Sequence, residues 1–128
     1  MEGENVEKTR RVLIADDCPH SRRGLRAVLN LRPEIVIVGE AMDGEEAVRL
    51  VAALRPDVIL MDAKMPRMDG VEATRLIKER WPEIRVVVLA IHAGYQAEAL
   101  AARADAFLIK GGPREELLAA IVDQSQEE

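Results

Sequence analysis

Short apolar runs recur along the chain, and each is followed by a stretch in which apolar residues return every three or four positions. The runs predict strands, and the spacing of the intervening stretches predicts amphipathic helices. Strands that are apolar throughout are typical of a parallel sheet with helices on both faces. The sequence therefore predicts an α/β fold of five strand–helix units. The predicted strands are residues 12–15, 35–38, 57–61, 86–90 and 106–109.

Turn and capping residues set the limits of the predicted helices. Pro19 suits a first helical turn, and Asp43 suits the N-cap of a helix with an acidic first turn. Pro56 closes that second helix, and the fourth is predicted to be short, at residues 97–102. The inward-facing positions of the other four helices include Leu25, Val28, Leu29, Ala47, Val48, Leu50, Val51, Leu54, Val71, Ala73, Thr74, Ile77, Leu117, Leu118 and Ile121.

The composition fits one globular domain. A chain of 128 residues with 48% hydrophobic and 32% charged residues is long enough to bury a single core. The polar ends, residues 1–9 and 123–128, are predicted to be flexible tails around a domain at residues 10–122.

The net charge and the cysteine content indicate which binding partners and which cellular compartment to expect. The formal net charge of −5 argues against direct nucleic-acid binding, and we interpret Arg22, Arg23 and Arg26 as a solvated helix face. Cys18 is the only cysteine, so no internal disulfide can form, and we expect it to pack rather than to act in redox chemistry. No apolar run approaches the roughly 18 residues of a membrane span. A cytoplasmic protein without membrane contact is expected.

Three aspartates stand where predicted strands end. Asp16 and Asp17 follow the first strand, and Asp62 follows the third. Because the carboxyl ends of parallel strands share one edge of the sheet, we expect the three carboxylates to converge there. Converging like charges need a cation, and an all-oxygen cluster suits a hard ion such as Mg²⁺. The alternative for Asp16 and Asp17 is a turn whose acids only cap the next helix.

Lys110 adds a positive charge at the same edge, since it follows the fifth predicted strand. Its ammonium group can pair with a carboxylate or with a bound phosphoryl group. A carboxylate beside Mg²⁺ and a lysine can attack phosphorus and form an aspartyl phosphate. The two cations would offset an added charge of about −1.5 to −2. The alternative is an ordinary surface lysine at a strand end.

Taken together, these motifs resemble the receiver domain of two-component response regulators. The resemblance covers roughly residues 10–121, and its motifs appear in order at the ends of the first, third and fifth strands. The motifs are Asp16-Asp17, Met61-Asp62, Met65-Pro-Arg-Met-Asp-Gly70 and Lys110.

Two further segments indicate the branch of that family. Asp17-Cys-Pro-His-Ser-Arg-Arg-Gly24 and Asp43-Gly-Glu-Glu-Ala47 are most similar to the NarL/LuxR-type branch, whose members usually precede a helix-turn-helix DNA-binding domain. The resemblance implies a doubly wound, flavodoxin-like sheet of five parallel strands in the order 2-1-3-4-5.

The resemblance also implies a role for each site residue. Asp62 would accept a phosphoryl group from a histidine kinase or phosphotransfer protein. Asp17 and Asp62 would offer carboxylate oxygens to Mg²⁺, Lys64 its backbone carbonyl, and Asp16 would hold the ion through water. Lys110 would pair with Asp62 or with its phosphoryl group. Such a receiver modifies itself without being a turnover enzyme, and it signals through contacts in a homodimer or with an output protein.

Ala90 and Phe107 depart from the usual receiver pattern. Receivers usually end the fourth strand with Thr or Ser, whose hydroxyl donates to the phosphoryl group, and Ala90 has no such donor. Phe107 occupies the position of the mobile aromatic but lacks a hydroxyl, and a core aromatic is the alternative. The interval between these residues is shorter than usual, so we expect the fourth helix to be short or displaced.

Three other positions bear on phosphate lifetime and local geometry. Lys64 and His92 stand two residues after Asp62 and Ala90, where they would flank an attacking water. An exposed loop histidine is the alternative for His92. The segment Lys110-Gly-Gly-Pro113 has a glycine pair where many receivers have proline, so no cis peptide is predicted there.

Two other functions are open beside the phosphorylatable receiver. A degenerate receiver would keep the fold but signal by binding alone, because Ala90 interrupts the switch. A Mg²⁺-dependent phosphatase with an aspartyl nucleophile would use similar groups. Those enzymes usually carry nucleophile and acid two residues apart, whereas Asp16 and Asp17 are adjacent.

Overall fold

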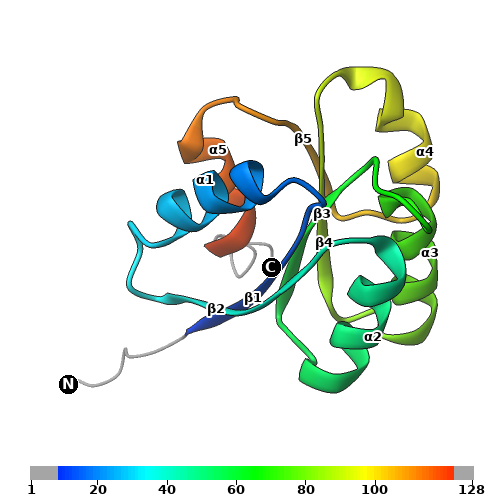
Figure 1. Cartoon of the computed structure of the whole chain (residues 1–128), viewed down its shortest axis with the longest axis horizontal. Helices are drawn as coiled ribbons and strands as arrows, with labels where there is room; N and C mark the ends of the chain where they lie inside the picture. Colours follow the sequence, from blue (N-terminus) through cyan, green and yellow to red (C-terminus); the bar gives the residue numbers. More distant parts are fainter. Residues whose placement is uncertain (1–8, 123–128) are drawn as a thin grey trace.

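A computed structural model describes residues 9–122, so the predicted tails lie outside the described residues except for Thr9 (Figure 1). The core of the fold is a five-stranded sheet with the order β2-β1-β3-β4-β5, and all its neighbouring strands are parallel. The predicted doubly wound fold and its strand order are therefore confirmed. The strands are β1 (Arg10–Ala15), β2 (Ile35–Ala41), β3 (Val58–Asp62), β4 (Arg85–Ala90) and β5 (Ala106–Ile109).

Helices cover both faces of the sheet. In Figure 1, α2, α3 and α4 lie on one side and α1 and α5 on the other. The fourth helix has only six residues, as predicted, and a short 3₁₀ turn, η2, precedes it. The elements are α1 (Pro19–Leu29), α2 (Gly44–Leu54), α3 (Gly70–Arg80), η2 (Ala93–Tyr95), α4 (Gln96–Ala101) and α5 (Arg114–Val122).

The apolar strands fill two cores, one on each face of the sheet. In β1, Leu13 and Ala15 pack with α2, α3 and α4, whereas Val12 and Ile14 pack with α1 and α5. This alternation follows from the two-residue period of a strand, and each fully buried aliphatic side chain stabilises the fold by about 1.5–3 kcal/mol. Phe107 on β5 is partly buried against the first of these cores. The sheet is therefore a rigid platform for the residues at its carboxyl edge.

Two helices on the first face begin with an aspartate cap. The Asp43 carboxylate accepts a hydrogen bond from the Glu46 amide at 2.8 Å, as predicted, and Asp69 accepts one from the Glu72 amide at 2.9 Å. The Glu46 amide and the Arg67 guanidinium lower the pKa of Asp43. The caps fix where α2 and α3 start, directly after the loops at the carboxyl edge of the sheet.

Gly70 allows α3 to begin against the end of β3. Its amide donates to the Ala63 carbonyl at 2.9 Å, and a Cβ on this residue would lie 1.9 Å from the backbone oxygen of Asp62. No side chain fits in that space. This close approach restricts the backbone conformation of the residues that follow Asp62.

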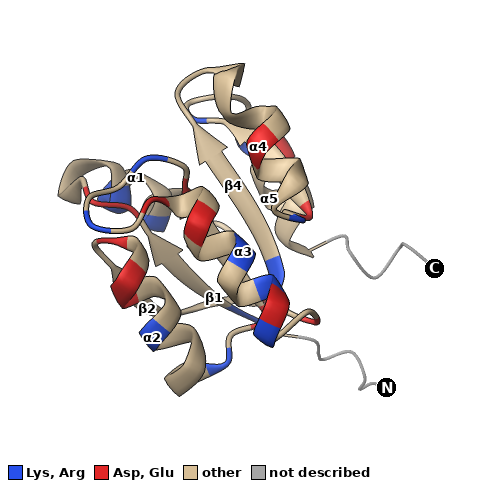
Figure 2. Cartoon of the chain, turned by 90° about the vertical axis from the view of Figure 1, so that its right-hand side faces the viewer, with Lys and Arg blue, Asp and Glu red and all other residues tan. Residues whose placement is uncertain are grey.

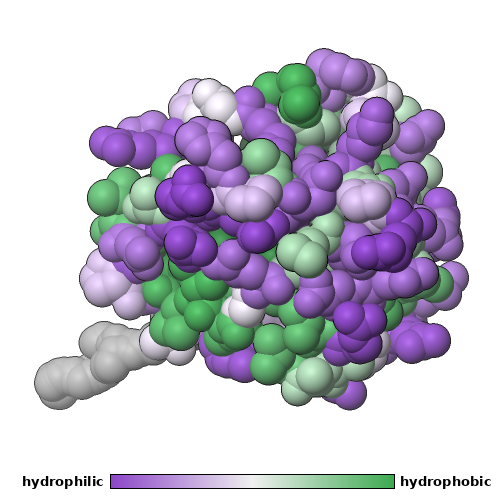
Figure 3. All heavy atoms as spheres, in the orientation of Figure 1, coloured by the Kyte–Doolittle hydropathy of each residue, from purple (hydrophilic) through white to green (hydrophobic). Residues whose placement is uncertain are grey.

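Charged residues occur along α2, α3 and α4, while β4 carries charge only at Arg85 (Figure 2). Apolar atoms reach the surface mainly across the lower middle of the face in Figure 3, where β1 and β2 run (Figure 1). Val36 on the edge strand β2 is 43% exposed. Among the helices of residues 9–122, none has the length and apolar content to cross a bilayer.

Gly70→Ala is expected to destabilise the protein by about 1–3 kcal/mol, because the new methyl group overlaps the Asp62 carbonyl. Gly24→Ala is the matched control, since a Cβ at that position in α1 meets nothing within 4 Å. Alanine there should stabilise the helix by roughly 0.5–1 kcal/mol. Urea unfolding measures both changes, and equal effects of the two substitutions would contradict the close-approach argument.

Candidate functional site

Three acidic side chains meet at the carboxyl edge of the sheet. Asp16 follows β1 directly, Asp17 is the next residue, and Asp62 is the last residue of β3. One carboxylate oxygen from each lies within 4.8 Å of the others. The structure thus brings together the three aspartates that the sequence analysis singled out.

Asp16 is the buried member of the cluster, with 1% of its surface exposed. Its Oδ1 accepts a hydrogen bond from the Cys18 amide at 2.9 Å. Its Oδ2 accepts two, from the Ser21 hydroxyl at 2.5 Å and from Lys110 Nζ at 2.9 Å. Both oxygens are therefore occupied by protein donors, and the contribution of Ser21 was not predicted.

Lys110 lies between two of the acids. Its Nζ is 2.9 Å from Asp16 Oδ2 and 3.4 Å from Asp62 Oδ2, so the shorter contact is with Asp16. Its backbone amide donates to the Ala90 carbonyl at 2.7 Å, and Gly111 then turns the chain away with a φ of 81°. Burial alone would lower the pKa of Lys110, but the hydrogen bond with Asp16 and the charges of Asp62 and Asp16 outweigh it and raise that pKa. The peptide bonds are trans throughout the described part of the chain.

Burial, more than neighbouring charge, disfavours the ionised form of Asp62. Burial raises the pKa of Asp62, and the charge of Asp16 adds to the rise. Lys110 and the Lys64 amide act in the opposite direction but do not reverse it. The ionised form of Asp62 is therefore held at a cost when the site contains no metal ion, and a cation in the cluster would relieve that cost.

A cleft of about 700 Å³ opens over the acidic cluster. Asp17 is exposed in it, and Lys64 from the loop after β3 is exposed at its wall. His92 is also exposed there; its Nδ1 accepts a hydrogen bond from the Gly94 amide at 3.1 Å, and its ring stacks on Tyr95. The structure therefore agrees with the exposed-loop alternative for His92.

Ala90 and Cys18 complete the surroundings of the site. Ala90 is 2% exposed at the end of β4, and its methyl group lines the cleft without offering a hydrogen-bond donor. Cys18 is exposed at the start of α1, so the prediction that its side chain packs was wrong. Its amide, rather than its thiol, contacts the acidic cluster, since the turn directs its side chain towards solvent.

The prediction of a solvated arginine face was correct only in part. Arg23 and Arg26 are exposed, but the Arg22 side chain is only 14% exposed and forms an ion pair with Glu40. Glu40 lies on β2, 18 positions away, and no local spacing predicts such a contact.

An acidic cluster with a lysine, placed at the carboxyl edge of a doubly wound five-stranded sheet, defines a signalling domain of the class that the motifs resemble. The chain belongs to the response regulator receiver domain family, whose sequence profile matches residues 12–122. The chain is therefore a receiver domain of two-component response regulators, as the sequence analysis predicted.

Relatives of the NarL/LuxR-type branch support the same assignment. The transcriptional regulatory protein DegU of Brevibacillus brevis is 39% identical over 112 residues, which are 86% of this chain and 48% of DegU. The nitrate/nitrite response regulator NarL of Escherichia coli K12 is 37% identical over 112 residues, or 86% of this chain and 52% of NarL. The chain spans about half the length of these curated relatives.

Solved structures confirm the fold. A LuxR-family two-component response regulator from Aurantimonas sp. SI85-9A1 has a TM-score of 0.85 at 33% identity. The match covers 91% of this chain and 85% of that one.

Asp62→Asn is expected to raise the melting temperature of the metal-free protein by a few degrees. The pKa of Asp62 is raised by folding, so its stabilising contribution is present at low pH and is lost as pH rises through that raised pKa. Asparagine removes the charge at every pH. Thermal unfolding with a chelator at neutral pH measures the gain, which should shrink as pH is lowered and Asp62 itself takes up a proton.

Asp69→Asn is the matched control for this measurement. Asp69 is exposed and caps α3, and asparagine caps helices about as well as aspartate. Its melting temperature should change little, and a gain as large as that of Asp62→Asn would count against a specific penalty on the ionised form of Asp62.

Proposed function

We propose that Asp62 accepts a phosphoryl group from a histidine kinase or phosphotransfer protein in a Mg²⁺-dependent reaction. One observation carries the proposal: Asp62 ends β3 in the cleft, with an oxygen in the three-aspartate cluster and another contact, at 3.4 Å, to the Lys110 ammonium. A carboxylate in these surroundings has the metal ligands and the counter-charge that acyl phosphate formation needs.

The donor set fits Mg²⁺. Three carboxylates face a single ammonium group within the cluster, and hard oxygen ligands are those that this ion prefers. Asp17 and Asp62 would hold the ion through carboxylate oxygens and Lys64 through its backbone carbonyl. Asp16, whose oxygens already accept hydrogen bonds from the protein, would hold it through water. The bound ion would neutralise charge at the site.

The side chains divide the chemistry between them. A carboxylate oxygen of Asp62 attacks the phosphorus of a phosphohistidine, the new O–P bond forms as the N–P bond breaks, and the imidazole leaves with its electron pair. Lys110 is placed to pair with the charge of about −1.5 to −2 that the phosphoryl group brings. Lys64 and His92, exposed at the cleft, would affect how readily water reaches the product.

The domain, which we place at residues 10–122, would signal through protein contacts, as a homodimer or with an output protein. We infer that it works in the cytoplasm, binds no nucleic acid directly and performs no multiple-turnover catalysis. Membership of the receiver family and a net charge of −5 support these inferences. Phe107, half-buried on β5, and Ala90 are the positions where a signal from Asp62 would first be felt.

A degenerate receiver is the second candidate, and Ala90 is the observation that favours it. The end of β4 offers a buried methyl group where the usual hydroxyl would donate to the phosphoryl group. Such a domain would bind partners in the same way with or without phosphate on Asp62.

Incubation with Mg²⁺ and acetyl phosphate should add the mass of one phosphoryl group to the intact protein. Asp62→Asn should abolish the addition, whereas Asp57→Asn should not, because Asp57 directly precedes β3, at the end away from Asp62, and accepts a hydrogen bond from the Arg11 amide. The absence of added mass under all conditions would refute the proposal.

The same samples separate the remaining candidates. Light scattering before and after phosphorylation should show a change of oligomeric state in a receiver that signals as a homodimer, and none in a degenerate one. Rapid multiple turnover of a phosphate ester would instead favour the phosphatase, which the sequence left open.

A further inference from the structure

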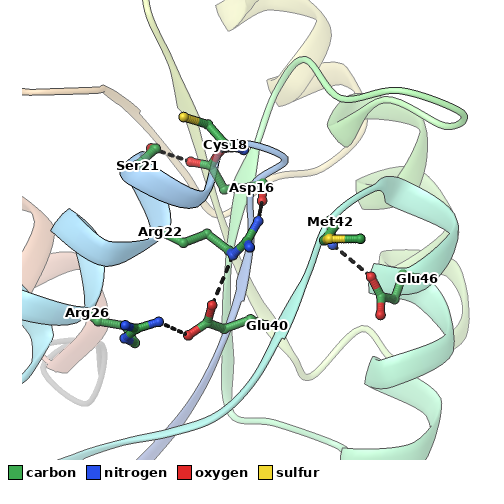
Figure 4. A network of polar contacts seen from close by, with 8 residues as sticks. All are labelled: Asp16, Cys18, Ser21, Arg22, Arg26, Glu40, Met42 and Glu46. Carbon is green, nitrogen blue, oxygen red and sulfur yellow. Dashed lines mark hydrogen bonds and ion pairs between the residues drawn. The ribbon is translucent and has the colours of Figure 1, made fainter.

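Arg22 links the acidic cluster to the edge strand of the sheet. Figure 4 shows its guanidinium between Asp16 and Glu40, with Arg26 on the far side of Glu40. The two arginines are four positions apart on α1, so both reach the same carboxylate on β2.

The two arms of Arg22 have different partners. One terminal nitrogen donates to the backbone carbonyl of Asp16 at 2.7 Å, and Nε donates to Glu40 Oε1 at 3.0 Å. The Arg22 side chain is 14% exposed and that of Glu40 26%, so both are largely shielded from water. Hydrogen bonds between charged groups in such surroundings are stronger than neutral ones.

The carbonyl that Arg22 contacts belongs to the peptide unit joining Asp16 to Asp17. The Asp16 amide, on the preceding peptide, donates to the Ala41 carbonyl of β2 at 3.0 Å. Peptide units are planar, so the contact from Arg22 fixes the orientation of the backbone from which the exposed Asp17 side chain projects. Both peptides around Asp16 are therefore tied to β2, one directly and one through Arg22 and Glu40.

Arg26 contacts Glu40 but not the backbone of Asp16. Its terminal nitrogen donates to Glu40 Oε2 at 2.8 Å, and its side chain is 44% exposed. The hydrogen bonds found for its side chain do not include the Asp16 carbonyl. Both arginines are therefore positively charged and pair with Glu40, but only Arg22 also contacts the backbone of Asp16.

We propose that Arg22, anchored by Glu40, is a positioning residue for Mg²⁺ binding: it orients the peptide before Asp17 and so presents that carboxylate to the ion. The inference rests on the Mg²⁺ site of the proposed function. Groups that orient metal ligands without touching the metal typically contribute 10–100-fold to metal affinity.

Electrostatics alone predicts the opposite result. A guanidinium near an acidic cluster repels a divalent cation, so removing the charge of Arg22 should tighten Mg²⁺ binding if charge were its only influence. Loss of orientation should weaken binding. The sign of the change therefore separates the two effects.

Calorimetric titration of the full chain with Mg²⁺ tests the proposal, with Arg22→Gln compared with Arg26→Gln. Both variants lose one positive charge and one ion pair with Glu40, but only the first loses the contact with Asp16. Arg22→Gln should weaken binding by roughly tenfold. Arg26→Gln should leave the dissociation constant unchanged or slightly lower. Equal constants for the two variants, or tighter binding by Arg22→Gln, would overturn the proposal.

Arg22→Lys keeps the charge but cannot reproduce the rigid fork that reaches both partners, so its binding should stay weak. Wild-type affinity in this variant would also overturn the proposal, and the variant decides the question if Arg22→Gln fails to fold. Circular dichroism and thermal unfolding identify folded samples, and the titrations are made well below the melting temperature.

Failure of the inference is distinct from failure of the proposed function. If the wild-type protein shows no Mg²⁺ binding, the metal site itself is refuted, and the positioning role with it. If the wild type binds and both arginine variants bind equally well, only the role of Arg22 is refuted.

Discussion

The convergence of the Asp16, Asp17 and Asp62 carboxylates at one edge of the sheet is the constraint on which the arrangement of that edge depends. The parallel sheet forces these groups together, because the strands that carry them end side by side. Donors from α1 and from the end of β5 surround Asp16 and spread part of the charge. The pKa of Asp62 is nevertheless raised, mainly by burial and then by the charge of Asp16. A cation at this edge would favour the ionised form of Asp62.

A backbone frame holds that crowded edge in place. The Gly44 amide donates to the Met68 carbonyl at 2.9 Å, and a Cβ at Gly44 would lie 2.1 Å from that oxygen. Arg67 and Asp43 join the same two loops through an ion pair. Together with the close approach of Gly70 to Asp62, these contacts lock the loop after β3 against the start of α2. The freedom left at the site belongs mainly to exposed side chains such as Lys64 and His92.

The sequence predicted the strands, the Asp43 cap and the meeting of the acids, because each follows from local spacing or from the geometry common to parallel sheets. It did not predict the contact of Ser21 with Asp16, or the pairing of Arg22 with Glu40. Both contacts depend on how α1 is rotated and positioned against the sheet. Apolar spacing predicts which face of the helix is buried, but not which polar side chains of α1 meet partners on other elements. Cys18 was misjudged for the same reason, since a single residue at a helix start has no periodic neighbours to show its direction.

The hydrogen bonds that Asp16 accepts from the protein affect how the site would bind a metal ion. Both oxygens of Asp16 already accept hydrogen bonds, whereas Asp17 is exposed and Asp62 has a longer contact, at 3.4 Å, with Lys110. A Mg²⁺ ion held by Asp17 and Asp62 would therefore keep several water molecules of its hydration shell. Such an ion would be held by few ligands from the protein. Occupancy would then follow the free magnesium of the surroundings, and under the proposed function the readiness of Asp62 to take a phosphoryl group would depend on that concentration.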